Sequence, residues 1–302
     1  MSELLFGLLF AHFFADYLCQ TNRINELKNS QVKKEQRKGL LIHTGHHLIC
    51  YIVIYSMIFF FYKNSSFQIF LTPIIICFIH FWIDFAKVRL IQEKNTLFKA
   101  IAYCVDQFLH VVAIYVVLQL ITNETHYTTD DLVLFFKSLL SNDYNHVLFS
   151  LKDKIFLLGA ITIITTHFYG YLFEIMLGPF KPSGTFKDTK IEAKLSQNTD
   201  AKENKLNEEY SYVVERTDTT TVYSEPPNRT GKYIGMIERL IIVILMTSKA
   251  ISAIGFLIAL KALTRFKQFE DKNFAEYYLI GNLLSVLFGF ISSFFAMRIL
   301  TL

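Results

Sequence analysis

Long apolar segments interrupted by single ionisable residues most constrain the fold of this 302-residue chain. Apart from a few such residues, stretches such as FGLLFAHFFADYLCQ and PIIICFIHFWIDFAK are long runs of apolar side chains, which is typical of membrane-spanning helices and unlike the alternating strands of a membrane barrel. Hydrophobic residues make up 52% of the chain, which disfavours a soluble domain. The sequence therefore predicts an all-α, polytopic helical membrane protein.

About eight segments are apolar enough to form transmembrane helices, although those near the C-terminus are short. The predicted spans cover about residues 3–20, 40–62, 68–90, 100–122, 155–178, 233–247, 250–264 and 274–300. Residues 233–264 fit either a hairpin of two short spans or one long kinked helix, and we favour the hairpin. Lys and Arg gather in the loops after the first and third spans, so these loops are expected to be cytoplasmic. The N-terminus and the C-terminus are then both outside.

The same pattern predicts five parts in chain order. Residues 1–122 form a four-helix transmembrane unit, and residues 123–153 form an external loop whose DDLVLFFKSLL segment fits an amphipathic helix. Residues 154–180 hold the fifth transmembrane helix, 181–232 a polar cytoplasmic loop, and 233–302 the C-terminal transmembrane helices. The 181–232 loop is a candidate docking segment for a protein partner.

Each of the first four apolar segments carries two ionisable residues spaced four apart. The pairs are His12 and Asp16, His43 and His47, His80 and Asp84, and Asp106 and His110. Positions i and i+4 lie on one helix face, and ionisable groups within a span are functional candidates that face a bundle interior or a wet cavity. The predicted topology places all four pairs in the cytoplasmic half of the bilayer, so we expect one shared site.

Five His and three Asp together form a set of metal ligands. Buried carboxylates repel one another, and a divalent cation relieves that repulsion; imidazole with carboxylate suits Zn, Mn or Fe. Eight ligands exceed the four of one tetrahedral site, so two ions are plausible, with some residues supporting the ligands. The alternative is that each pair is polar glue between helices.

Lys87 and Asp84 are the candidate catalytic residues. Lys87 follows Asp84 by three positions and His80 by seven, so it shares their face and could hold an anionic substrate such as a lipid phosphate. Alternatively, Lys87 only extends its ammonium group from the end of its span to the membrane surface. His167 and Glu174 in the fifth span could join the site or make only local polar contacts.

Other classes of protein fit the sequence less well. The net charge is only +4 and the basic residues lie between spans, so we expect no nucleic-acid partner. The four cysteines form no CxxC pair, which argues against a zinc ribbon or a disulfide framework. HTGHH at 43–47 matches an HxxHH box of membrane di-iron desaturases, but those proteins use several such boxes and this chain has one.

HFFADYLCQ, LLIHTGHH, HFWIDFAK and DQFLH, in this order, resemble a bacterial multi-pass family catalogued as domain of unknown function 3307. The later strings IGMIER, FLIALKALTRF and FAEYYLIG are similar to its second half. The resemblance implies a multi-pass topology in the bacterial inner membrane and no particular mechanism. A looser resemblance, through the His/Asp pairs alone, is to membrane-bound metal-dependent hydrolases.

Three functions fit these features. The first is metal-dependent hydrolysis of a lipid-linked or membrane-proximal substrate from the cytoplasmic leaflet, which makes membrane lipids the expected partners. The second is transport or sensing of metal ions, since an ion path also needs ligands within spans. The third is a structural or effector membrane protein whose His/Asp pairs are polar glue.

Overall fold

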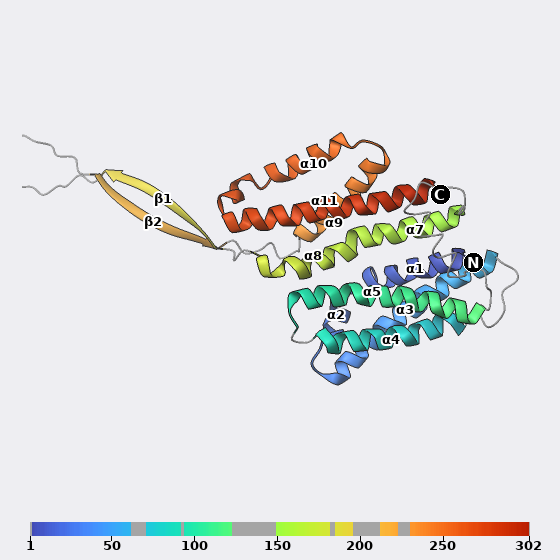
Figure 1. The fold of residues 1–302 in the computed structure, drawn as a ribbon. Helices are drawn as coiled ribbons and strands as arrows, with labels where there is room; N and C mark the ends of the chain where they lie inside the picture. The colour runs from blue at the N-terminus through green and yellow to red at the C-terminus, as the bar shows by residue number, and fades with distance from the viewer. Residues whose placement is uncertain are drawn as a thin grey trace, which may run out of the picture.

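The computed structural model describes residues 2–61, 71–91, 94–122, 149–181, 185–195, 212–222 and 230–301. These residues form a bundle of long helices, with one two-stranded ribbon extending from it (Figure 1). The all-α prediction is correct for the bundle, and the ribbon is the exception to it.

The N-terminal half of the bundle carries the predicted site. It consists of α1 (Ser2–Tyr17), the short α2 (Asn22–Lys28), α3 (Lys33–Phe61), α4 (Leu71–Ile91) and α5 (Thr96–Thr122). Helix α3 packs against α1, α2 and α4, and α4 also packs against α5. Apolar side chains such as Leu8, Tyr51, Ile76 and Ile114 fill the core between these helices.

The second half begins with a helix that changes its winding in the middle. It runs as α7 (Leu151–Ile163), the π-helical turn η2 (Ile164–Phe168), α8 (Tyr169–Leu177) and the short 3₁₀ turn η3 (Gly178–Phe180). Helices α9 (Thr230–Thr247), α10 (Ser252–Leu263) and α11 (Lys272–Thr301) follow, with the 3₁₀ turn η4 (Phe266–Glu270) before α11. Helix α7 packs against both α1 and α11, so it joins the two halves.

Several helices have the length and composition of membrane spans. Four qualify outright, over Lys33–Ile58, Thr96–Ile121, Leu151–Phe180 and Lys272–Thr301, and a fifth if α1 and α2, which meet at a bend of 87°, form one broken span. Large apolar side chains such as Phe78, Phe108 and Leu120 are exposed on the outside of the bundle. Such a surface belongs in lipid, so the chain is a membrane protein. Both termini lie at the same end of the bundle (Figure 1).

The polar segment predicted as a loop contains strands. Strands β1 (Thr185–Leu195) and β2 (Tyr212–Val222) pair antiparallel along their full length, from Thr185 opposite Val222 to Leu195 opposite Tyr212. The polar loop predicted over 181–232 therefore contains an antiparallel pair of strands over these two segments. Their many Thr and Val residues favour the extended backbone, and the overall polarity of the segment hid that preference.

Two further predictions concern residues 233–264 and the segment 123–153. Residues 233–264 form the separate helices α9 and α10 rather than one kinked helix, and the break contains Lys249 in a left-handed conformation with φ of 61°. The amphipathic helix expected within 123–153 lies outside the described residues, which resume at residue 149.

Candidate metal centre

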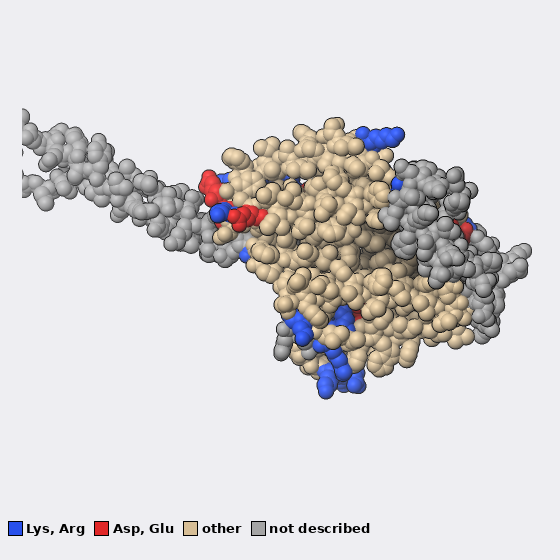
Figure 2. Space-filling view, in the orientation of Figure 1, with Lys and Arg blue, Asp and Glu red and all other residues tan. Residues whose placement is uncertain are grey.

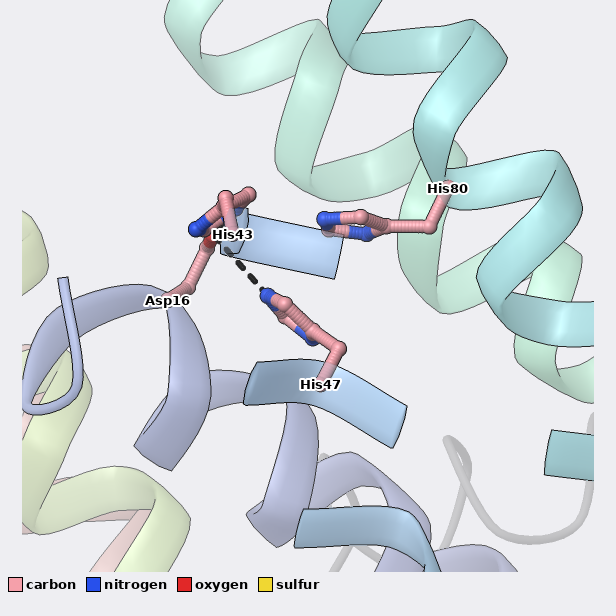
Figure 3. A group of neighbouring side chains, drawn as sticks. All are labelled: Asp16, His43, His47 and His80. Atoms are coloured by element: carbon pink, nitrogen blue, oxygen red, sulfur yellow. Dashed lines mark ion pairs between the residues drawn. The ribbon is translucent and has the colours of Figure 1, made fainter. Parts of the chain in front are cut away.

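Four helices place all eight predicted ligands in one buried cluster. Helix α1 contributes His12 and Asp16, α3 contributes His43 and His47, and the other four come from α4 and α5. All five imidazoles are buried, with at most 2% of their surface exposed. Figure 3 shows Asp16, His43, His47 and His80 converging from three helices.

One potential ligand group is centred on the Asp16 carboxylate. Its Oδ1 lies 3.0 Å from His43 Nε2 and 3.4 Å from His47 Nε2. The His80 ring lies against that of His47, with the ring centroids 3.9 Å apart. Ligand atoms of Asp16, His43, His47 and His80 all lie within 4.8 Å of one another, which suits a four-coordinate metal ion.

A second group shares His80 with the first. His80, Asp84 and His110 also offer ligand atoms within 4.8 Å of one another. Asp84 Oδ2 lies 3.6 Å from His80 Nε2 and 3.3 Å from His43 Nε2, so this member of the second group also contacts the first. One shared imidazole and one intermediate carboxylate are compatible with either one ion or two neighbouring ions.

His12 and Asp106 lie beside these groups rather than in them. The His12 ring stacks on that of His110 at a centroid distance of 5.0 Å, and His12 Nδ1 lies 3.4 Å from the Tyr51 hydroxyl. Asp106 Oδ2 accepts a hydrogen bond from Lys87 Nζ at 2.6 Å. The structure therefore gives these two predicted ligands the positions of supporting residues.

The orientation of His110 leaves one of its nitrogens available to a metal. Its Nδ1 lies 2.7 Å from the backbone carbonyl oxygen of Asp106, and a carbonyl only accepts, so Nδ1 carries the proton. In the neutral ring, Nε2 then has the free lone pair. Metal-bound histidines are commonly oriented by such a bond from the other ring nitrogen.

Most imidazole nitrogens of the cluster have no hydrogen-bond partner among the described residues. These buried atoms are His12 Nε2, His110 Nε2 and both ring nitrogens of His43, His47 and His80. Nearby carboxylate oxygens are close but not aligned for hydrogen bonds to them. Buried polar atoms are normally satisfied, so this concentration of free lone pairs and N–H groups in one place indicates a missing ligand.

Two lysines lie among the three carboxylates. Besides its bond to Asp106, Lys87 Nζ is 4.0 Å from Asp84 Oδ1, and 24% of its side chain is exposed. Lys28 Nζ donates to Asp84 Oδ2 at 2.7 Å, and Lys28 is buried. Three carboxylates against two ammonium groups leave the cluster with a net charge of −1, apart from the imidazoles.

The contribution of Lys28 was not predicted from the sequence. Lys28 lies in the basic segment after the first span, which was interpreted only as a topology signal. The sharp bend between α1 and α2 turns that segment back against α3, and Gly39 of α3 permits the approach. A Cβ atom added to Gly39 would lie 2.5 Å from the backbone nitrogen of Lys28.

Gln107 is a second residue of the cluster that was not predicted. Its Nε2 donates to Asp16 Oδ2 at 2.6 Å and lies 3.2 Å from Asp106 Oδ2, so it links α5 to α1. The sequence signal was its position, because Gln107 is a polar residue within an apolar span directly after Asp106.

His167 and Glu174 do not join the centre. His167 Nδ1 pairs with the Thr166 hydroxyl at 2.8 Å, and Glu174 lies 3.6 Å from Lys232. Both residues therefore make local polar contacts, which is one of the two roles predicted for them.

Comparison with known families supports the predicted resemblance. The family model described as "Protein of unknown function (DUF3307)" matches residues 4–139, which include all eight predicted ligands, Lys28 and Lys87. The match ends before α7, so the similarity expected for the C-terminal helices lies outside it. Neither the curated proteins nor the solved structures yield a match to this chain.

Proposed function

We propose that the N-terminal helices hold one or two divalent metal ions and that the chain is a metal-dependent hydrolase of a lipid-linked or membrane-proximal substrate. The observation that carries the proposal is the buried cluster of five imidazoles with unpartnered nitrogens around Asp16 and Asp84. Nitrogen and carboxylate donors of this kind fit Zn, Mn or Fe. Asp16, His43, His47 and His80 would be the principal ligands, with Asp84 and His110 completing the centre.

The proposed reaction also needs an approach for the substrate. The imidazoles are sealed off, whereas the Asp16 side chain is 11% exposed and that of Lys87 is 24% exposed. Asp16 and Lys87 are therefore the members of the cluster nearest the surface. The proposed opening lies on the side of Lys87, whose ammonium group would hold an anionic part of the substrate, such as a phosphate. A bound divalent ion would supply Lewis acidity and activate a water molecule for attack.

Our proposed topology puts this opening at the cytoplasmic face of a bacterial inner membrane. Eight alternating crossings by α1, α3, α4, α5, α7–α8, α9, α10 and α11 would leave both termini outside. The common position of the termini is what such a count requires, and the Lys- and Arg-rich segments at the other end of α1, α3, α4 and α5 support its orientation.

The polar-glue alternative has a specific observation in its favour. The bonds from Lys28 to Asp84, from Lys87 to Asp106 and from Gln107 to Asp16 give each carboxylate a partner without any metal. These bonds account for the carboxylates, but they leave most of the imidazole nitrogens without an aligned hydrogen-bond partner among the described residues. We therefore prefer the metal centre, and a metal measurement decides between the two.

The first experiment measures metal content. Protein purified without chelator is compared by elemental analysis with the double variant His47→Ala/His80→Ala and with His167→Ala, a control that removes a histidine outside the centre. We expect near-stoichiometric Zn, Mn or Fe in the wild-type protein and in the control, and its loss from the double variant. A folded wild-type protein that holds no metal even after reloading would overturn the metal centre.

The second experiment addresses hydrolysis. Metal-loaded protein in mixed micelles is given a lipid phosphate and, separately, a lipid ester, with and without chelator. The proposal expects turnover that chelator abolishes and one metal restores, and that Lys87→Met reduces without lowering metal content. Full metal occupancy without turnover of either substrate would favour the remaining alternative, metal transport or sensing, which uptake of Zn or Mn into vesicles tests directly.

A further inference from the structure

The outer face of α3 carries a second feature, which the metal centre does not use. Four basic residues, Lys33, Lys34, Arg37 and Lys38, border an open groove at the start of this helix together with Leu41 and Ile42. Figure 2 shows Lys and Arg side chains gathered at the end of the molecule where α2 and α3 lie. His43 and His47 belong to the opposite, inner face of the same helix.

The four basic side chains of the groove are exposed, and none of them has an ion-pair partner in the described parts of the chain. The one acidic residue in this stretch, Glu35, accepts a hydrogen bond from Ser30 at 2.7 Å. The groove therefore presents a concentrated positive charge. A basic cluster beside a membrane span attracts anionic lipid headgroups, and each Lys or Arg near the surface adds to the attraction.

An apolar strip continues from these charges along the same face of α3. Leu41, Ile49, Ile52 and Val53 are between 49% and 63% exposed, and Gly45, which lies between them, has no atom within 4 Å of the position of an added Cβ. Residues 41 to 53 extend about 18 Å along the helix axis. One leaflet of the hydrocarbon core is about 15 Å thick, so the strip matches the length of an acyl chain.

We infer that this face of α3 binds an acidic phospholipid. The phosphate would lie among Lys34, Arg37 and Lys38, and an acyl chain would run past Gly45 over the apolar strip. The basic groove favours an anionic headgroup, and the apolar strip favours an acyl chain. A free phosphate would therefore occupy the groove and leave the strip uncovered. The site is separate from the metal centre and does not depend on the proposed hydrolase activity.

Lipid binding can be measured on the whole protein in mild detergent. Phosphatidylglycerol, phosphatidylcholine and inorganic phosphate are each titrated into delipidated protein, and bound lipid is counted by native mass spectrometry. The groove variant is Lys33→Gln/Lys34→Gln/Arg37→Gln/Lys38→Gln. The control Lys94→Gln/Lys249→Gln/Lys267→Gln/Lys272→Gln removes the same charge from exposed lysines elsewhere.

We expect phosphatidylglycerol to bind the wild-type protein and the control variant with similar affinity, and the groove variant at least about tenfold more weakly. Equal affinity in the groove variant, or equal binding of phosphatidylcholine, would refute the site. Inorganic phosphate that competes fully with phosphatidylglycerol would show that the groove binds the anion alone and would overturn the lipid proposal. Metal content should be unchanged in the groove variant, because its residues lie away from the ligands.

Discussion

Replacing Gly39 by alanine tests how α2 delivers Lys28 to the metal centre. The new methyl group would lie 2.5 Å from Lys28 N, 2.7 Å from Leu27 C and 2.8 Å from Leu27 Cβ. Two of these three atoms are backbone, so the contact cannot be relieved by a side-chain rotation. The separation must grow by about 1 Å to reach ordinary van der Waals distance, which moves α2 away from α3.

That displacement is large compared with the hydrogen bond it disturbs. Lys28 Nζ lies 2.7 Å from Asp84 Oδ2, and an added 1 Å would take the pair to about 3.7 Å, beyond hydrogen-bond range. Overpacking costs about 1–3 kcal/mol, and a buried charge that loses its partner costs about 3–5 kcal/mol. The higher helix propensity of alanine offsets about 1 kcal/mol. We expect a net loss of about 3 kcal/mol or more in the free energy of unfolding.

The matched control lies in the same helix. Gly45→Ala adds the same methyl group where nothing is within 4 Å, so it should leave stability unchanged or raise it by up to about 1 kcal/mol. Thermal unfolding of both variants in one detergent, followed by tryptophan fluorescence and circular dichroism, measures the difference. If Gly39→Ala is as stable as Gly45→Ala, the close packing of α2 on α3 and the delivery of Lys28 by it are refuted.

Three further results are expected from the buried polar contacts. Lys28→Met should destabilise the metal-free protein by about 3–5 kcal/mol, since it removes the cation that hydrogen-bonds to the buried Asp84 and leaves only Lys87 at 4.0 Å. Mn or Zn should stabilise this variant more than the wild type in thermal unfolding, and equal stabilisation would contradict the proposed role of Asp84. Lys261→Met should be strongly destabilising because Lys261 Nζ is 2.5 Å from the buried Glu238, and adding Glu238→Gln should recover part of the loss; a double-mutant cycle without coupling would show that the pair is not bonded. Arg239→Met should lower stability by about 2–4 kcal/mol by removing two hydrogen bonds from a buried guanidinium, whereas Lys249→Met, at an exposed position, should change it little; similar unfolding temperatures for these two variants would count against the role given to Arg239.

Much of the helical core could be predicted from the sequence because hydrophobic length and the i, i+4 spacing are local properties. The four ionisable pairs fall on four different helices, and a common helix face together with a common predicted depth was enough to expect one cluster. The polar ribbon was missed for the opposite reason. A composition rich in charge and Thr indicates a solvated loop, while the pairing of β1 with β2 depends on a contact between distant segments.

The partners of Lys28 and Arg239 could not be predicted from local sequence patterns. Lys28 reaches Asp84 only because α1 and α2 meet at 87° and Gly39 admits α2, and neither feature has a periodic signature. Arg239 follows Glu238 in sequence, yet the two side chains turn to different partners: Glu238 pairs with Lys261 of α10, and Arg239 bonds to the backbone of η2. Tertiary geometry decided both cases.

The π-helical turn in the α7–α8 rod has a consequence for the order of assembly. Arg239 Nε and Nη2 donate to the carbonyl oxygens of Thr165 and Thr166 at 2.6 and 2.9 Å, so α9 supplies donors to backbone carbonyls within this turn. In lipid, each unsatisfied backbone group costs several kcal/mol. During synthesis α7 and α8 enter the membrane before α9 exists, so the bonds from Arg239 to Thr165 and Thr166 can form only after α9 has docked. An NMR probe at these two carbonyls would therefore report when the C-terminal helices have joined the bundle.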